Sequence, residues 1–201
     1  MRTDFLTREF APEDASAVDE LWVRAFGGYE EDFPGSAEAV ERGAVVLAQT
    51  GNRLVVAEVE FKGRVAGAAR LWADDGVGWF DLLAASVTGA GKALVRRMER
   101  DAQDAGIRWL RTTCPDYRPL PDYFSRIGYQ TVGRVNELLT LERRLPLLTV
   151  REQRRADAAA ISALTGEDPW PFEQGHRPGW FVLADGERVA GRLRCPWRCL
   201  S

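Results

Sequence analysis

The sequence contains a single histidine, His176, and three cysteines, Cys114, Cys195 and Cys199, among its 201 residues. One histidine excludes a multi-histidine metal site within the chain and argues against a Ser-His-Asp or Cys-His catalytic set. Three cysteines do not make a disulfide framework, and such sparing use is typical of a reduced, cytoplasmic protein. We therefore expect neither disulfides nor a bound metal.

No stretch approaches the roughly 18 consecutive apolar residues that a membrane-spanning helix needs. The opening residues M-R-T-D-F-L-T-R-E-F also lack the apolar segment of a secretory signal. The net charge of −3 offers no overall basic surface for nucleic acid. Because 45% of the residues are hydrophobic, a well-packed core is expected. These features predict a cytoplasmic globular protein that binds neither membrane nor nucleic acid.

The chain is organised around the stretch S-V-T-G-A-G-K-A-L, Ser86 to Leu94. The continuously apolar run W-F-D-L-L-A-A, residues 79–85, precedes it and is typical of a central strand. A long helical pattern follows, up to Gly106. A glycine turn between a strand and a helix directs backbone N–H groups and the positive end of the helix dipole at an anion. The stretch therefore predicts a phosphate-binding turn.

Hydrophobic periodicity predicts an α/β (α+β) protein with a mixed sheet and helices packed against it. The expected strands are 5–10, 54–60, 65–72, 79–85, 107–114, 129–134 and 136–144. The expected helices are 12–26, 36–42, the pattern after the glycine turn, and 122–127.

The end of the sequence repeats its beginning. Thr7–Leu21 aligns without gaps on Val150–Leu164, and R-V-A-G at Arg64–Gly67 recurs at Arg188–Gly191. Because the two matches occur in the same order, duplication explains them better than coincidence.

We therefore expect residues 1–144 to form one domain and residues 145–201 to form a truncated second copy of its opening β-α-β-β half. So short a segment buries little surface alone. We expect it to pack on the first domain or on another subunit, covering an open sheet edge. A homodimer through the half-repeat is one such arrangement.

The order of elements and the glycine motif resemble the GNAT superfamily of acyl-CoA-dependent N-acyltransferases. The resemblance covers Thr3 to about Arg144. The family signature Q/R-x-x-G-x-G/A reads here S-V-T-G-A-G, so that Gly89 and Gly91 match while Ser86 replaces Gln or Arg. The resemblance implies that the chain binds acetyl-CoA, with pantetheine along the preceding strand and the pyrophosphate on the loop amides.

The implied pantetheine contacts are Leu82, Leu83, Ala84 and Ala85, and the implied pyrophosphate contacts are Val87, Thr88, Gly89, Ala90, Gly91 and Lys92. Lys92 and Arg96, near the start of the helix, can add positive charge for the phosphates.

A second family signature, an aromatic pair followed by x-x-x-G-F, is present as Y-F-S-R-I-G-Y, Tyr123 to Tyr129. In the family a tyrosine four residues before the glycine protonates the leaving thiolate, and Phe124 holds that position here. A phenyl ring cannot donate a proton, so Phe124 is expected only to contact the cofactor. Tyr123 is the first choice as proton donor; Tyr117, water, or a reaction without acid catalysis remain alternatives.

The chemistry requires a neutral amine beside a positioned thioester. A backbone N–H of the central strand can polarise the thioester carbonyl, and a carboxylate can take the proton of the amine. Asp81 and Glu58 are the candidates for that base, although Glu58 can equally be a solvated strand residue. The acidic loop Tyr29–Asp32 lies on the expected acceptor side and suits a cationic amine, or is an ordinary solvated loop.

The resemblance thus implies an N-acetyltransferase that transfers an acyl group to a primary amine of a small molecule or peptide by direct attack in a ternary complex. The alternative is a non-catalytic or weakly active acyl-CoA-binding or regulatory protein, which Ser86, Phe124 and the incomplete second copy favour. Nucleoside triphosphate binding is disfavoured because Ser86 and Ala93 break the pattern G-x-x-x-x-G-K-[ST]. Dinucleotide binding is disfavoured because Leu94 replaces the third glycine of G-x-G-x-x-G. A turn with a purely structural role is the remaining alternative.

Overall fold

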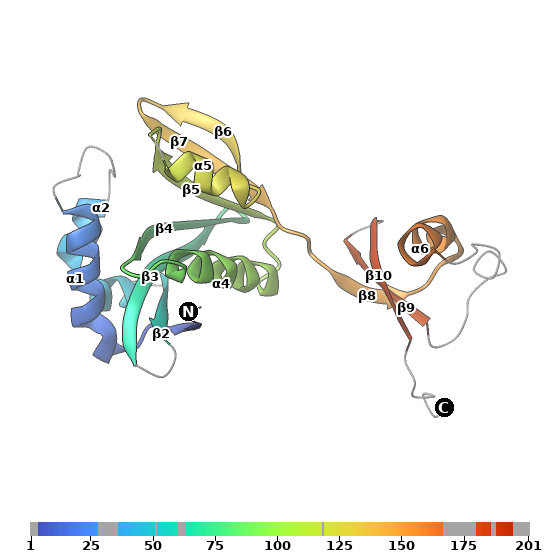
Figure 1. Ribbon diagram of the computed structural model, residues 1–201, viewed down its shortest axis with the longest axis horizontal. Helices are drawn as coiled ribbons and strands as arrows, with labels where there is room; N and C mark the ends of the chain where they lie inside the picture. The colour runs from blue at the N-terminus through green and yellow to red at the C-terminus, as the bar shows by residue number, and fades with distance from the viewer. Residues whose placement is uncertain are drawn as a thin grey trace. The chain divides into compact units, whose positions relative to one another are not determined.

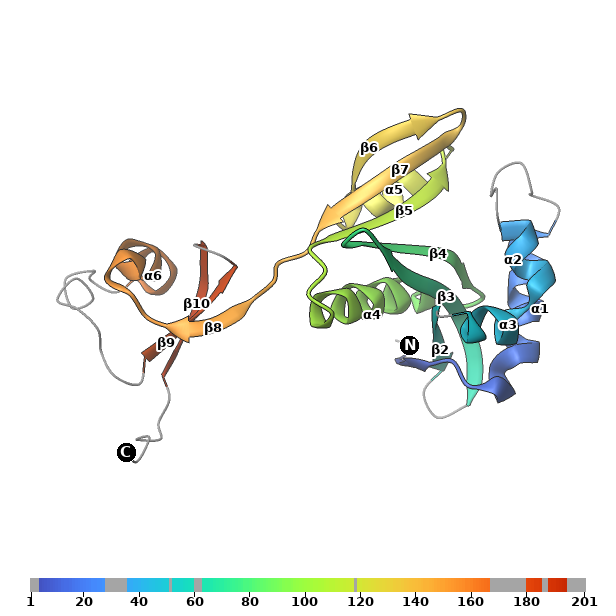
Figure 2. The same cartoon turned by 180° about the vertical axis from the view of Figure 1, so that it is seen from behind.

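The computed structural model describes residues 4–27, 36–50, 52–59, 63–117, 119–166, 180–185 and 188–194. The chain divides into two compact units, Met1–Leu145 and Pro146–Ser201. Figures 1 and 2 show the elements of each unit from opposite sides.

The first unit follows the expected order of elements, with one addition. Its strands are β1 (Phe5–Glu9), β2 (Arg53–Val59), β3 (Arg64–Asp74), β4 (Val77–Ala85), β5 (Trp109–Pro115), β6 (Gln130–Val135) and β7 (Leu138–Arg144). Its helices are α1 (Ala15–Phe26), α2 (Ser36–Arg42), α3 (Ala44–Gln49), α4 (Ala90–Asp104) and α5 (Leu120–Arg126), with the short 3₁₀ helix η1 (Pro12–Asp14) before α1. The addition is α3, which sequence reasoning missed because a short apolar run such as A-V-V-L-A-Q has no diagnostic period.

The seven strands form one sheet in the order β1-β2-β3-β4-β5-β7-β6. Every neighbouring pair is antiparallel except β4 and β5, which run parallel. The parallel pair arises because α4 carries the chain back from the end of β4 to the start of β5. The expected mixed, mostly antiparallel sheet is confirmed, and the apolar run 79–85 is indeed a central strand.

Helices cover both faces of the sheet (Figures 1 and 2). On one face α4 packs through Leu94 and Met98, which are fully buried. On the other face α1 packs through Trp22, which is also fully buried. Side chains alternate along β2, so that Val55 belongs to the α4 side of the core and Val56 to the α1 side. Burial of both faces explains the near-continuous apolar character of the central strands.

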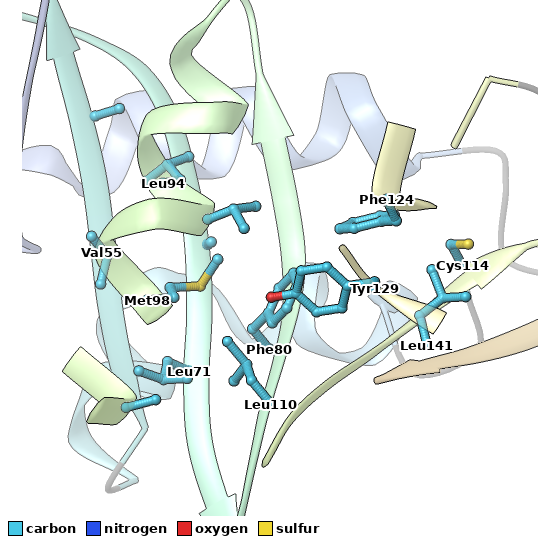
Figure 3. Packing of buried hydrophobic residues seen from close by; sticks show 14 of the residues in the cluster. Val55, Leu71, Phe80, Leu94, Met98, Leu110, Cys114, Phe124, Tyr129 and Leu141 are labelled. Carbon is cyan, nitrogen blue, oxygen red and sulfur yellow. The ribbon is translucent and has the colours of Figure 1, made fainter. Parts of the chain in front are cut away.

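Three aromatic rings connect β4 to α5 and to the residue that precedes β6 (Figure 3). The ring centroid of Phe80 lies 6.0 Å from that of Phe124 and 5.9 Å from that of Tyr129. Phe124 and Tyr129 are 5.4 Å apart, with their rings inclined at 70°. These are favourable edge-to-face and tilted arrangements. The cluster anchors α5 and so fixes the position of Phe124.

The second unit has the elements β8 (Thr149–Glu152), η2 (Arg155–Asp157), α6 (Ala158–Thr165), β9 (Trp180–Asp185) and β10 (Arg188–Arg194). Its three antiparallel strands follow the order β10-β9-β8. A small core forms where Ile161 of α6 packs with Val182, Ala184 and Val189.

In the described part of the chain, no helix combines the length and the apolar character needed to cross a membrane. Several expectations concern residues outside the described ranges: the acceptor-side loop Tyr29–Asp32, His176, Cys195 and Cys199.

Candidate active site

The parallel strands β4 and β5 separate part-way along their length. Their pairing stops at Trp79 opposite Arg111. A cavity of about 80 Å³ lies at the separation. It is lined by Phe26, Ser36, Asp81, Leu82, Leu83, Thr112, Thr113, Cys114, Leu120, Phe124 and Leu138. Because Phe26 packs in the core on the α1 side and Phe124 in the core on the α4 side, the cavity is lined by residues from both faces of the sheet.

A β-bulge in β4 marks the start of this separation. Between two normal pairs with β3, Ala69 alone faces both Leu82 and Leu83. Leu82 has a φ of +48°, in the left-handed region that residues other than glycine seldom adopt. The indole Nε1–H of Trp22 donates a hydrogen bond of 2.9 Å to the Leu82 carbonyl oxygen. Strained backbone that is held by its surroundings is common at functional sites, and bulges occur beside them.

Asp81 brings a carboxylate to the cavity immediately before the bulge. Arg70 on β3 donates to both carboxylate oxygens, and the Nε–Oδ1 distance is 2.7 Å. Burial raises the pKa of Asp81, and the neighbouring Arg70 offsets this effect only in part. The Asp81 carboxylate, which is only partly buried, is therefore a stronger base than a fully exposed aspartate, as proton abstraction from an amine requires.

A row of aromatic and cationic side chains holds Arg70 in place. The Arg70 guanidinium lies 4.8 Å from the ring centroid of Trp72, which stacks on Trp79 at 6.4 Å. Arg111 lies 5.7 Å from the ring centroid of Trp79. These cation–π contacts restrict the orientation of Arg70 and thereby that of Asp81.

The glycine turn places the start of α4 directly after β4. Gly89 is the N-cap residue with a φ of +100°, and no side chain caps the helix. A Cβ at Gly89 would also lie only 3.2 Å from the ring of Phe5. In the described part of the chain the N–H groups of Gly89 and Gly91 have no hydrogen-bond partner. Such unpaired donors at the positive end of a 15-residue helix fit a pyrophosphate.

The residues implied to contact coenzyme A form a continuous path along the chain from the cavity to α4. Leu82 and Leu83 line the cavity. Ala84 belongs to the core beneath α1, so a ligand on the other side of β4 can reach only its backbone. Ala85, Thr88 and Lys92 are exposed, Val87 and Gly91 are partly buried, and Ala90 is fully buried.

A second cavity, of about 310 Å³, lies beside α4, α5 and β7. Its lining residues are Lys92, Val95, Arg96, Glu99, Arg126, Ile127 and Arg143. Arg143 donates to Glu99 at 2.6 Å. Four cationic side chains around one carboxylate leave an excess of positive charge next to the first turns of α4. The predicted partners of phosphate, Lys92 and Arg96, therefore lie together in a basic environment.

The aromatic pair of α5 is divided between two environments. Phe124 is 4% exposed and lines the cavity. The Tyr123 hydroxyl is buried and has no hydrogen-bond partner in the described part of the chain. Burial raises the pKa of Tyr123, Glu99 of α4 raises it further, and Arg96 lowers it. Tyr123 thus faces α4, and the structure does not bring its hydroxyl to the cavity that contains Asp81.

Cys114, which also lines the cavity, is a thiol rather than a nucleophilic thiolate. Burial, with a contribution from Asp116, raises the pKa of Cys114 to about 11. The thiol therefore stays protonated at neutral pH, and its sulfur is a weak nucleophile.

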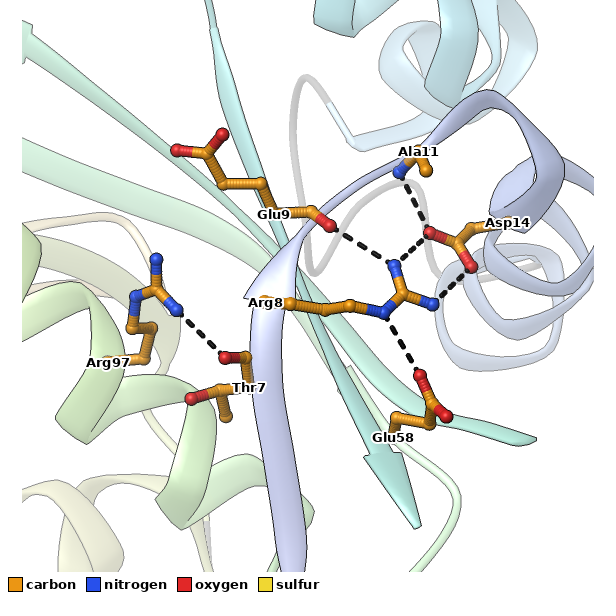
Figure 4. Close-up of polar contacts among 7 residues, drawn as sticks. All are labelled: Thr7, Arg8, Glu9, Ala11, Asp14, Glu58 and Arg97. Carbon is orange, nitrogen blue, oxygen red and sulfur yellow. Dashed lines mark hydrogen bonds and ion pairs between the residues drawn. The ribbon is translucent and has the colours of Figure 1, made fainter. Parts of the chain in front are cut away.

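Glu58 belongs to an ion-pair network with Arg8 and Asp14 (Figure 4), and it does not line the cavity. Arg8 donates to Glu58 at 3.0 Å and to the two carboxylate oxygens of Asp14 at 2.6 and 2.8 Å. On β3 the partners of Glu58 and Asp81 are five positions apart, which corresponds to roughly 17 Å along a strand. The structure therefore does not bring these two carboxylates together. Glu58 connects β2 to β1 through Arg8 instead.

Sequence reasoning missed Trp22, Arg70, Thr112, Thr113, Cys114, Leu120 and Leu138, all of which touch the bulge, Asp81 or the cavity. Trp22 carries only the signal of a core residue on an amphipathic helix. Arg70 could have been found from the two-residue turn Asp75-Gly76 that follows β3, because counting back from this turn places Arg70 opposite Asp81.

No protein-family profile matches the chain, and no curated protein matches its sequence. Its fold does match solved structures. PaiA N-acetyltransferase from Thermoplasma acidophilum, in complex with coenzyme A, is 14% identical with a TM-score of 0.55, over 70% of this chain and 99% of that chain. A GCN5-related N-acetyltransferase from Rhodopseudomonas palustris is 21% identical with a TM-score of 0.56, over 72% and 99%. N-acetylglutamate synthase from Neisseria gonorrhoeae, complexed with coenzyme A and N-acetyl-glutamate, is 20% identical with a TM-score of 0.53, over 72% and 36%. This likeness shows that the chain has the GNAT fold.

Proposed function

We propose that this chain, which has the GNAT fold, is an acetyl-CoA-dependent N-acetyltransferase that transfers the acyl group to a primary amine by direct attack in a ternary complex. The observation that carries the proposal is the cavity at the Leu82 bulge of β4, the strand that continues directly into the Gly89 turn and α4. The cavity suits a thioester, and the turn suits phosphates. Two of the matched proteins were solved with coenzyme A.

Each part of the reaction has a residue suited to it. Acetyl-CoA supplies the acyl group as a thioester. The N–H groups of Gly89 and Gly91, with Lys92 and Arg96, hold its phosphates. Asp81 accepts the proton that the amine loses as nitrogen bonds to the acyl carbon and the carbon–sulfur bond breaks. The departing sulfur takes its proton from water, because Phe124 has none to give.

A second function, acyl-CoA binding without transfer, is favoured by one specific observation. The cavity presents the phenyl ring of Phe124 where the family has a tyrosine, and the Tyr123 hydroxyl faces α4. A binding protein needs the phosphate-holding turn but no proton donor. Asp81 distinguishes the two functions, since a protein that only binds acyl-CoA does not need a carboxylate of raised pKa at the acyl site.

The test is release of free thiol from acetyl-CoA in the presence of a broad panel of amines, measured with a thiol-reactive dye. Transfer predicts thiol release with at least one amine, together with an acylated product of the expected mass. If coenzyme A binds in isothermal titration but no amine releases thiol, the binding function replaces the enzyme. If coenzyme A does not bind at all, both are wrong.

We expect Gly89→Val to weaken coenzyme A binding by more than about tenfold. A Cβ there would lie 3.2 Å from the ring of Phe5, and valine strongly resists the φ of +100° that presents the amides. Gly133→Ala is the control: Gly133 lies on β6, outside the residues proposed to hold coenzyme A, and a Cβ there makes only an ordinary contact of 3.6 Å with the Thr140 side chain. It should keep coenzyme A affinity within about twofold. If a folded Gly89→Val protein bound coenzyme A with wild-type affinity, the phosphates would not bind at the N-terminus of α4.

We also propose that the second unit, Pro146–Ser201, is a truncated copy of the opening β-α-β-β half; Leu145, expected to begin it, is buried in the core of the first unit instead. Three details beyond the sequence matches support this. A 3₁₀ helix precedes the α-helix in both units. The buried Asp14 and Asp157 each accept a hydrogen bond from the N–H three residues earlier, at 2.8 and 2.7 Å. In both hairpins the alanine of R-V-A-G, Ala66 or Ala190, is the extra residue at a register shift.

A further inference from the structure

The hydrogen bond from Trp22 to Leu82 connects α1 to the backbone of the proposed acyl site. Trp22 is fully buried, and its Nε1–H lies 2.9 Å from the Leu82 carbonyl oxygen. That carbonyl belongs to the residue with a φ of +48°, at the point where Ala69 faces two residues of β4. A buried carbonyl in irregular backbone needs a donor that the sheet does not supply. Trp22 is that donor.

The orientation of one peptide group follows from this bond. The Leu82 carbonyl and the Leu83 N–H belong to the same peptide, which is planar and trans, so the two bonds point in opposite directions. The carbonyl points to Trp22 on the α1 side of the sheet. The Leu83 N–H must therefore point away from α1. Leu83 lines the cavity, and its side chain packs with the core on the α4 side.

We infer that Trp22 is a positioning residue for catalysis: its indole N–H holds the Leu82–Leu83 peptide so that the Leu83 N–H faces the thioester carbonyl oxygen. This inference rests on the proposed function. A donor fixed before the reaction stabilises the charge that develops on that oxygen, whereas a free peptide would have to reorient. Leucine disfavours the left-handed conformation of Leu82, so without a restraint this residue would tend to leave it and the Leu82–Leu83 peptide would turn.

The test is the ¹³C resonance of the carbonyl carbon of labelled acetyl-CoA bound to the full chain. A hydrogen bond to the carbonyl oxygen withdraws electrons from the carbon and moves its resonance downfield from the position in free acetyl-CoA. We expect a clear downfield displacement in the wild type. Trp22→Phe, which keeps a ring but removes the donor, should lose most of this displacement while still binding acetyl-CoA.

Val18→Ala is the matched control for a weakened core. Val18 is a buried residue of α1 in the same cluster as Trp22, and its truncation lowers stability without touching the Leu82 carbonyl. It should retain the full displacement. With an amine identified from the panel, Trp22→Phe should lower kcat about tenfold, as removal of one well-aligned hydrogen bond does. The KM for acetyl-CoA should be unchanged.

If Trp22→Phe does not fold, β-(3-benzothienyl)alanine at position 22 replaces the N–H with sulfur at almost constant shape, and the same loss of displacement is expected. Full displacement without the indole N–H would overturn the inference. So would an undisplaced resonance in wild-type protein that binds acetyl-CoA, although the proposed function would then still stand. Absence of acetyl-CoA binding in the wild type would instead refute the proposed function.

Discussion

Phe80→Ala is expected to lower the free energy of unfolding of the first unit by about 3–5 kcal/mol, the range for truncating a fully buried aromatic ring. Phe80 is 1% exposed and contacts the rings of Phe124 and Tyr129 at 6.0 and 5.9 Å between centroids. Its removal leaves a cavity and also deprives α5 of its anchor on β4. Because Phe124 lines the candidate active site, we expect loss of acetyl-CoA affinity in the surviving folded fraction.

Urea unfolding followed by near-ultraviolet circular dichroism measures this loss directly, since the signal depends on fixed aromatic packing. Val135→Ala is the control: Val135 is 69% exposed on β6, and its truncation should change stability by less than about 0.5 kcal/mol. A loss below about 1 kcal/mol for Phe80→Ala would mean that the site collapses around the gap and that the aromatic cluster does not anchor α5.

Most elements of the first unit can be predicted from local sequence patterns. One pair of site residues can be predicted by counting residues outward from a hairpin turn. The apolar spacing of Val18 and Trp22 predicts α1, and the run 79–85 predicts a central strand. Asp75 and Gly76 both have positive φ, as the two central residues of a type I′ hairpin turn do. Counting outward from that turn would have paired Arg70 with Asp81, which is the pair that the structure has. The D-G dipeptide was thus sufficient to find the partner of the proposed base.

The same counting gives the wrong partners beyond Leu82, because the bulge shifts the register there. The bulge lies at the candidate active site. Leu82 adopts left-handed backbone, for which leucine has no preference, so nothing local predicts the bulge. The conformation is held by tertiary contacts, among them the Trp22 hydrogen bond across 60 residues. The cavity lining likewise combines residues from α1, α2, β4, β5, α5 and β7. Sequence order also says little about which carboxylates meet in space: Glu58 pairs with Arg8 and does not line the cavity that Asp81 lines.

Asp81→Asn is expected to lower acetyl transfer by roughly 10²- to 10⁴-fold, the usual contribution of a positioned general base. Coenzyme A affinity should be unchanged, because the phosphates are held at α4. Glu58→Gln is a matched control, since Glu58 accepts a hydrogen bond of 3.0 Å from Arg8 but does not line the cavity. It removes a comparable ion pair and should retain transfer within about threefold. Equal losses in both variants would assign the effect to the ion pair rather than to the base.

The pH dependence identifies the same group in two independent measurements. Burial raises the pKa of Asp81 above its usual value of 3.8, so transfer should increase with pH through the raised pKa as the base ionises. The contribution of Asp81 to the free energy of unfolding changes with pH in the opposite direction to transfer. Between 3.8 and the raised pKa the folded state holds a proton that the unfolded state has lost, so the free energy of unfolding falls as pH rises. Asp81→Asn should abolish both changes and leave only the increase due to deprotonation of the amine at higher pH. If transfer by this variant still increased between pH 3.8 and the raised pKa of Asp81 as it does in the wild type, another group would be the one that titrates and acts as the base.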